Sequence, residues 1–123
     1  MIQITPHMRI MLYNQSVDFR KGIDGLARLC KEKLLENPFS GMMFVFRNRS
    51  KTGIKILVYD GQGFWMCYKR LSEGQFRSWP MDRNNKGRDL EAHHLQLLLV
   101  AGNPDEAYVP PAWKALRKIS EKE

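Results

Sequence analysis

Few side chains in this chain have the types and spacing that catalysis needs. Three carboxylates, Asp18, Asp24 and Asp60, are candidates for the converging ligands with which a metal-dependent nuclease binds divalent cations. Asp18 also suits a helix N-cap or a turn, and Asp60 suits a turn. Asp24 has Arg28 one helical turn away as an ion-pair partner. Because each carboxylate has such a structural role, we expect no catalytic residue and no metal site, and the nuclease stays only an alternative.

The histidines and cysteines form no metal or nucleophile motif either. His93 and His94 are adjacent, so on a helix they point about 100° apart and cannot bind one metal ion together. Cys30 and Cys67 lack the Cys-x-x-Cys spacing and lie in apolar segments, which is typical of buried thiols in a reducing compartment. The chain has no glycine-rich phosphate loop and no serine or cysteine nucleophile motif. We therefore interpret it as a non-enzyme without a cofactor.

The apolar runs and the N-terminus predict a location. No apolar run reaches the roughly 18–20 residues that a membrane helix needs. Residues 1–6 lack a basic region followed by an apolar stretch, so we expect no signal peptide. These features predict a cytoplasmic protein that does not bind membranes.

Positive charge is concentrated in one part of the chain. The net charge is +7, with 20 Lys and Arg residues against 13 Asp and Glu. Residues 1–80 hold 13 Lys or Arg and 6 Asp or Glu, whereas residues 81–123 hold 7 of each. A local positive field raises the affinity for polyanions such as nucleic acids. The alternative is a solvated basic surface that only keeps the protein soluble.

The connection over residues 47–53 is the strongest candidate for a phosphate-binding segment. It links two predicted strands and carries three cations, Arg47, Arg49 and Lys51, and no acid. We predict that these three side chains contact phosphates from a flexible hairpin tip. The predicted nucleic-acid surface is extended by five further cations: Arg20, Lys21, Lys55, Lys69 and Arg70.

The elements that must position these cations are a strand meander and an amphipathic helix. Apolar runs predict strands over residues 8–13, 42–46, 54–59, 64–68 and 76–79, with residues 14–16 as a break and 60–63 as a turn. Apolar residues at helical spacing predict helices over residues 19–36, 90–101 and 112–119. Residues 81–89 are polar and aperiodic, and we expect them to form a loop.

The register of the meander predicts which side chains share a face. If residues 60–63 turn the chain, Tyr59 faces Phe64, and residues directly opposite each other point to the same side. We expect the core face, covered by helix 19–36, to hold Ile54, Ile56, Val58, Trp65, Cys67 and Leu71, with Phe44 and Phe46 beside them. The second face interleaves aromatic residues with cations and would bind nucleic acid, or be covered by the C-terminal helices or another subunit: Lys55, Leu57, Tyr59, Phe64, Met66, Tyr68 and Arg70.

Together these elements predict a single domain of the α+β class over residues 1–123. Its expected architecture is a small antiparallel β-sheet meander covered by an N-terminal helix, with C-terminal helices. The sheet and its helix would occupy residues 1–80, the loop residues 81–89, and the C-terminal helical segment residues 90–123. A chain of this length can bury a core without disulfides.

Six segments carry motifs in register over about residues 9–80. They are Asp18-Phe19-Arg20-Lys21-Gly22-Ile23-Asp24-Gly25-Leu26, Asn37-Pro38-Phe39-Ser40-Gly41, Phe44-Val45-Phe46-Arg47-Asn48-Arg49, Lys55-Ile56-Leu57-Val58-Tyr59-Asp60-Gly61-Gln62-Gly63, Tyr68-Lys69-Arg70-Leu71 and Phe76-x-x-Trp79-Pro80. In this order and spacing they resemble the small accessory proteins, called TnpB, of bacterial insertion sequences of family sixty-six. The resemblance implies a companion to a larger DDE transposase encoded in the same element, with no established catalytic role.

Two hypotheses for the function follow. The first is an accessory factor of DNA transposition that binds nucleic acid through the basic hairpin and sheet surface. The second is a protein–protein adaptor that docks the transposase, or another copy of itself, through the second sheet face and Trp113 without contacting DNA. The expected partners are therefore DNA, the transposase of the same element and a second copy in a homo-oligomer.

Overall fold

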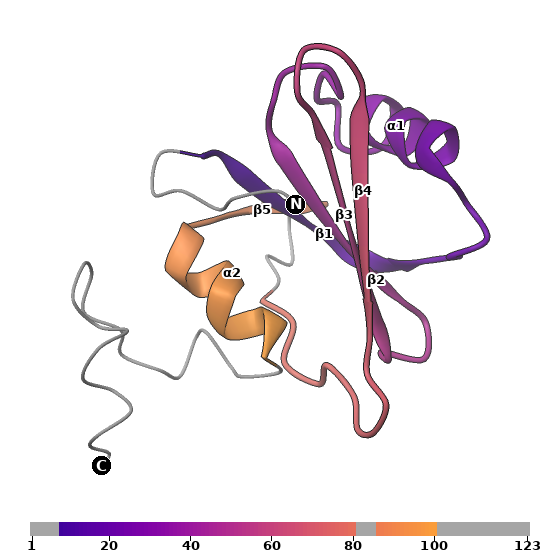
Figure 1. Ribbon diagram of the computed structural model, residues 1–123, viewed down its shortest axis with the longest axis vertical. Helices are drawn as coiled ribbons and strands as arrows, with labels where there is room; N and C mark the ends of the chain where they lie inside the picture. Colours follow the sequence, from indigo (N-terminus) through magenta and orange to yellow (C-terminus); the bar gives the residue numbers. More distant parts are fainter. Residues whose placement is uncertain (1–7, 81–85, 101–123) are drawn as a thin grey trace.

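Continuous apolar runs in the two central strands decide the architecture. In the computed structural model, which describes residues 8–80 and 86–100, strands β2 (Met43–Asn48) and β3 (Gly53–Tyr59) bury side chains on both of their faces. A sheet with two buried faces needs a cover on each side. Helix α1 (Ile23–Glu32) covers one face, and helix α2 (Ala92–Leu99) covers the other (Figure 1).

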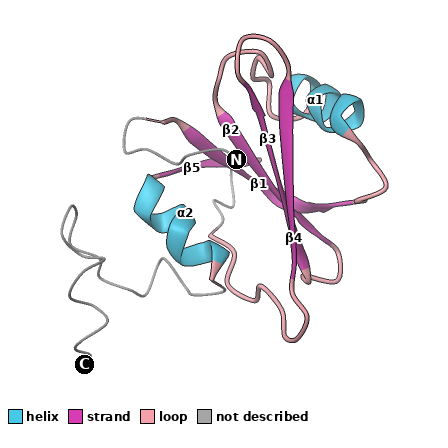
Figure 2. Ribbon diagram, in the orientation of Figure 1, coloured by secondary structure: helices cyan, strands magenta, loops and turns pink. Residues whose placement is uncertain are grey.

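The sheet has five strands in the order β4–β3–β2–β1–β5. Strand β1 (Ile10–Val17) is parallel to β2, while the pairs β2–β3, β3–β4 and β1–β5 are antiparallel, with β4 at Phe64–Arg70 and β5 at Gly87–Leu90. The α+β class and the meander β2–β3–β4 are confirmed, and Figure 2 shows them with one helix on either side. The predicted arrangement with an N-terminal helix is not confirmed, because β1 precedes α1 and joins the meander as a parallel neighbour of β2.

The register of the meander is confirmed, but one face assignment is wrong. Tyr59 pairs with Phe64 as the turn at residues 60–63 predicts, and the Asp60 carboxylate accepts hydrogen bonds from the backbone N–H groups of Gln62 and Gly63. In the neighbouring pair of strands, however, Phe44 lies opposite Leu57. Phe44 and Phe46 therefore share the face of Leu57 and not that of Ile56.

Each face of the sheet has its own hydrophobic core. Helix α1 packs on the face of Leu57, and the buried residues there are Tyr13, Val17, Leu26, Cys30, Met42, Phe44, Phe46 and Leu57. Helix α2 packs on the face of Ile56, and the buried residues there are Ile10, Leu12, Met43, Val45, Ile54, Ile56, Phe76, Trp79, Leu90, Leu95 and Leu98. The prediction that helix 19–36 covers the Ile56 face is thus wrong, because both faces are apolar enough to be cores.

Trp65 is not the core residue that its strand pattern predicts. Its side chain lies on the α2 side of β4 and is 46% exposed. The indole N–H donates a hydrogen bond to the Asp60 carboxylate at 2.8 Å. Because β4 is an edge strand, α2 does not reach far enough across the sheet to bury this ring.

Several predicted boundaries also change. Residues 14–16 do not break β1, which continues to Val17 with an irregular register. Residues 76–79 form no strand, and helix α1 is shorter than the predicted 19–36. Part of the predicted loop 81–89 belongs to β5, which pairs with β1. The predicted helix over residues 112–119, with Trp113, lies outside the described residues, as do residues 81–85.

We predict that Phe46→Ala lowers the free energy of unfolding by about 3–5 kcal/mol, because this fully buried ring leaves a cavity between β2 and α1. Trp65→Ala should cost clearly less, because the half-exposed indole loses little burial. Urea unfolding followed by circular dichroism measures both values. Equal losses for the two variants would show that the face assignment is wrong.

Candidate nucleic-acid interface

Three loops meet at one end of the sheet and form a basic surface, which we call the basic end. It consists of residues 18–22 after β1, the β2–β3 turn at residues 48–52, and residues 69–77 at and beyond the end of β4. Backbone N–H groups of Leu71 and Phe76 donate to the carbonyls of Thr52 and Lys51, so the third segment is bound to the turn. These ranges hold seven cations, Arg20, Lys21, Arg49, Lys51, Lys69, Arg70 and Arg77, and two acids, Asp18 and Glu73.

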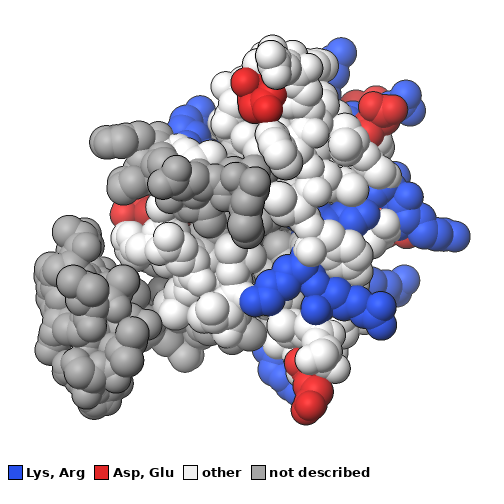
Figure 3. Space-filling view, in the orientation of Figure 1, with Lys and Arg blue, Asp and Glu red and all other residues white. Residues whose placement is uncertain are grey.

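Figure 3 shows Lys and Arg side chains gathering on this part of the molecular surface, around the end of β4 and the adjacent hairpin. The opposite end of the sheet differs, because its connections over residues 35–42 and 60–63 contain no Lys or Arg. The loops at the basic end therefore hold more cations than these two connections at the opposite end, although exposed cations such as Arg9 and Lys33 also lie elsewhere.

The β2–β3 turn presents two cations from a fixed backbone. The Asn48 side-chain oxygen accepts hydrogen bonds from the N–H groups of Thr52 and Gly53, both at 3.0 Å. Lys51 adopts φ 64°, the left-handed conformation that closes the turn. Arg49 and Lys51 are both exposed. The turn thus holds their side chains out toward solvent, as a phosphate-binding tip requires.

Arg47 differs from these two cations because it is part of the interior of the fold. Its guanidinium donates a hydrogen bond to the Phe76 carbonyl at 2.8 Å and lies 4.7 Å from the centre of the Trp79 ring. The Nε atom is buried, and burial lowers the pKa of Arg47. Trp79 in turn donates its indole N–H to the Tyr13 carbonyl. Arg47 therefore anchors the segment after β4 and does not extend from the hairpin tip.

Lys55 is also internal, contrary to the prediction that it extends the basic surface. Its side chain is 5% exposed. The ammonium donates to the carbonyls of Phe19 and Lys21 at 2.8 and 3.1 Å, and it lies 5.0 Å from the Phe19 ring and 5.4 Å from the Tyr68 ring. This contact ties the loop before α1 to the middle of β3. A phosphate cannot replace these partners without opening the loop.

The loop before α1 contributes Arg20 and Lys21, both exposed. The Arg20 guanidinium donates to both carboxylate oxygens of Asp18 and lowers the pKa of Asp18 to about 2. Asp18 is therefore not the helix N-cap, a position that Gly22 occupies. Because the Asp18 carboxylate engages the Arg20 guanidinium, Lys21 is the stronger phosphate-binding candidate of the two.

The end of β4 adds Lys69 and Arg70, which are exposed and point to opposite faces of the sheet. Lys69 donates to the Leu99 carbonyl at 2.6 Å, at the end of α2. Arg77 is an exposed cation that we did not predict for this surface. The structure places Arg77 at this surface because the neighbouring residue, Phe76, donates its backbone N–H to the Lys51 carbonyl of the β2–β3 turn.

An open hollow of about 790 Å³ lies between the loop before α1 and the β2–β3 turn. Arg20 and Arg49 line it from opposite sides, together with Asn48 and Ser50. Cationic and hydrogen-bond-donating side chains around a shallow opening suit a phosphate group. Asp18 lines the hollow as well, but its carboxylate is bound by Arg20.

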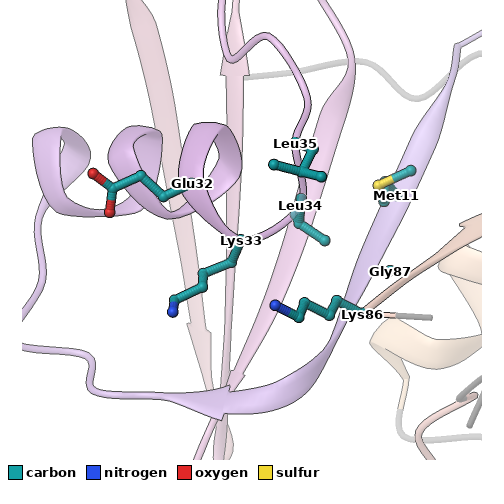
Figure 4. A pocket seen from close by; sticks show the side chains of 7 residues that line it. All are labelled: Met11, Glu32, Lys33, Leu34, Leu35, Lys86 and Gly87. Carbon is teal, nitrogen blue, oxygen red and sulfur yellow. The ribbon is translucent and has the colours of Figure 1, made fainter. Parts of the chain in front are cut away.

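A second hollow, of about 510 Å³, lies between the end of α1 and the strands β1 and β5. Figure 4 shows the Lys33 and Lys86 side chains extending toward this opening, while Glu32 points away from it. Its other lining residues are mostly apolar, among them Met11 and Leu34. Two cations without a convergent acid or nucleophile give this hollow no evident chemistry.

Within residues 8–80 and 86–100, no group of three or more His, Cys, Asp or Glu side chains could hold a metal ion. His93 and His94 have ring centres 4.3 Å apart, and His93 lies 3.7 Å from the Glu91 carboxylate. Neither helix in these ranges has the length and apolar content to span a bilayer.

Comparison with known proteins places these observations in a family context. A family model described as "IS66 Orf2 like protein" matches residues 8–107. In Sinorhizobium fredii, "Uncharacterized protein y4hO" is 38% identical over 108 residues, which cover 88% of this chain and 90% of that protein. In the same organism, "Uncharacterized protein y4jC" is 39% identical over 69 residues, which cover 56% of this chain and only 59% of that protein. No solved structure matches the chain.

We predict that Lys55→Met lowers the free energy of unfolding by about 1–3 kcal/mol, because the carbonyls of Phe19 and Lys21 lose their donor inside the fold. The matched control is Lys31→Met, an exposed position on α1, which should change stability by less than about 0.5 kcal/mol. Urea unfolding measures both. If the two variants are equally stable, Lys55 is not an internal anchor.

Proposed function

Because the chain belongs to the IS66 Orf2-like family, whose members are accessory proteins of transposition, we propose that it assists transposition by binding DNA through its basic end. The DNA would lie across the three loops of this end. The cations that contact it are Arg49 and Lys51 of the turn, Lys21 of the loop before α1, Lys69 and Arg70 at the end of β4, and Arg77 beyond it. Arg20 acts as a secondary contact.

The observation that carries this proposal is the convergence of seven cations and two acids on one end of the sheet. Cations within about a Debye length of one another, roughly 8–10 Å at physiological salt, sum their potentials, and this raises the rate and strength of polyanion binding. Binding to several phosphates at once also releases counterions from the DNA, which makes the affinity depend steeply on salt. Such contacts fix the position of a duplex and carry little sequence information.

An exposed ring next to the cations adds a second kind of contact. Tyr68 is 52% exposed on the α1 side of β4, beside Arg70, and its ring packs edge-on against Phe19 at 5.4 Å between ring centres. A ring held in this way can stack on an unpaired base. DNA with frayed or single-stranded ends is therefore a better ligand for this surface than an intact duplex of the same length.

We predict that Arg49→Gln, Lys51→Gln and Arg70→Gln, made together, weaken DNA binding and reduce the slope of log affinity against log salt by about 1 for each lost phosphate contact. The measurement is fluorescence anisotropy with labelled element-end DNA over a range of salt concentrations. Arg47 is left unchanged, because its loss would disturb the core and confuse the result.

The matched control removes the same number of charges elsewhere: Lys31→Gln, Lys33→Gln and Lys86→Gln. These exposed cations lie near the end of α1 and around the second hollow, away from the basic end. The control should lower affinity only slightly and leave the salt slope nearly unchanged. Equal effects of the two triple variants would mean that the net charge, and not the basic end, determines binding. No binding by the wild-type protein at low salt would refute the proposal.

A second candidate function is that of a protein adaptor for the transposase. Helix α1 covers the middle of the second sheet face at Leu57, so this part of the face cannot supply the docking site. The observation that favours an adaptor is at the end of the sheet opposite the cations, where Phe39, 58% exposed, packs against Tyr59 and Phe64 with ring centres 5.0 and 5.2 Å apart. Exposed aromatic clusters often mark protein interfaces.

Co-purification separates the two candidates. An adaptor stays with the transposase after nuclease treatment in high salt, and Phe39→Ala should then weaken the complex by about tenfold or more. A DNA-bound factor is lost from the transposase under the same conditions. Retention that Phe39→Ala does not alter would remove the aromatic cluster as the docking site.

A further inference from the structure

Strand β4 is an open edge of the sheet. Within the described residues it pairs only with β3, and no other strand lies on its outer side. It is seven residues long and contains neither proline nor a bulge, two of the devices that protect an edge strand, and its charged residues, Lys69 and Arg70, stand only at one end. Two of the exposed large hydrophobic residues, Trp65 and Tyr68, lie on it. An edge of this length and composition can pair with another strand.

The backbone of β4 shows which groups are available for such pairing. At its two ends, Asp60 N–H donates to the Gly63 carbonyl and Leu71 N–H donates to the Thr52 carbonyl. Hydrogen-bonded and non-hydrogen-bonded pairs alternate in an antiparallel ladder, so the odd-numbered residues of β4 bond to β3. The N–H and C=O groups of the even-numbered residues point outward: Phe64, Met66, Tyr68 and Arg70.

We propose that two copies of the chain join through their β4 strands, antiparallel and related by a two-fold axis at Cys67, so that the two sheets become one. Cys67 is the middle residue of the strand, which runs from Phe64 to Arg70. This is therefore the only two-fold register that pairs all residues of both strands. Met66 and Tyr68 then exchange backbone hydrogen bonds across the axis, and the two Cys67 residues form a non-hydrogen-bonded pair.

The side chains of β4 are complementary to themselves in this register. Lys69 lies opposite Trp65 of the second copy, on the α2 side, and Arg70 lies opposite Phe64, on the α1 side. A cation and an aromatic ring that lie opposite each other on paired strands attract one another. Parallel pairing in register would instead place Lys69 and Arg70 beside the same residues of the second copy, where like charges repel. The charges at one end of the strand therefore select the antiparallel arrangement.

Lys69 and Arg70 would repel a strongly basic strand, so charge also favours a second copy as the occupant of the edge. The short strand fits a weak, reversible dimer. Seven residues from each chain bury less surface than a stable interface needs, so we expect association at micromolar or higher concentrations. In such a dimer Lys69 and Arg70 lie opposite Trp65 and Phe64 of the second copy, while the other cations of each basic end, on residues 18–22, 48–52 and 71–77, lie outside the joined strands. The dimer would thus carry two DNA-binding surfaces.

Cys67 provides a direct test, because it would meet its own copy at the axis. Opposite residues of a non-hydrogen-bonded pair have Cα atoms about 4.5 Å apart, which is within the range of disulfide-bonded cysteines. Mild oxidation of the full chain with diamide should give a disulfide-linked dimer, and Cys67→Ser should abolish it. Cys30 cannot substitute, because it is fully buried. As a control for random collisions, Ser50→Cys in the Cys67→Ser background places an exposed thiol at the basic end and should cross-link at least tenfold more slowly.

A pair of substitutions at one position tests the charge argument without oxidation. Trp65→Lys places a cation opposite Lys69 of the second copy, and Trp65→Glu places an anion there. Sedimentation equilibrium should show at least a tenfold weaker dimer for Trp65→Lys, and a dimer as strong as the wild type for Trp65→Glu. Both variants should fold, because Trp65 is half-exposed.

Three results would overturn the proposal: a wild-type monomer up to several hundred micromolar, equal dimerisation of the two Trp65 variants, or a cross-linking rate for Ser50→Cys that matches that of Cys67. Alkylation of Cys67 then identifies the actual occupant of the edge. Slow alkylation in a monomer would assign the edge to another segment of this chain. Protection that appears only when the transposase is added would assign it to the transposase.

Discussion

Burial of β2 and β3 on both faces is the constraint from which the rest of the structure follows. Two central strands without a polar face require one helix on each side, and the chain supplies these from different regions of its sequence. Because α1 must cross over one face between β1 and β2, the loop that enters it is brought to the same end of the sheet as the β2–β3 turn. The clustering of cations at that end is thus a result of the topology.

Two of the cations in this region hold the basic end together and do not face the solvent. Lys55 binds the carbonyls of the loop before α1, and Arg47 binds the carbonyl of Phe76 in the segment after β4. Each connects one outer loop to a central strand. The exposed cations of the loops depend on these internal contacts for their positions, much as catalytic side chains depend on the groups that orient them.

The sequence was sufficient for the meander and its register, because the turn at residues 60–63 contains residues with strong turn preferences. It could not assign the faces, since the apolar run at residues 42–46 has no alternation that would distinguish one side from the other. Strand β5, with the sequence Gly-Arg-Asp-Leu, has no local strand preference and forms because β1 offers it an edge. For the candidate site, the sequence gives the position of each cation along the chain but does not indicate whether that cation is buried. From the sequence, Lys55 between two isoleucines is expected at the surface. Only the structure shows that the loop before α1 covers it.

The guanidinium of Arg47 also restricts which side chain can occupy position 47 of this chain. It lies over the Trp79 ring while it donates to the Phe76 carbonyl, which requires a flat cation with donors at its rim. An ammonium group is compact and cannot satisfy both partners in that geometry. Exchange of arginine for lysine should therefore cost little stability at the solvent-facing Arg49 and more stability at Arg47. In the Arg-Asn-Arg segment, two residues of identical type thus meet different physical requirements, Arg47 that of packing and Arg49 that of electrostatics.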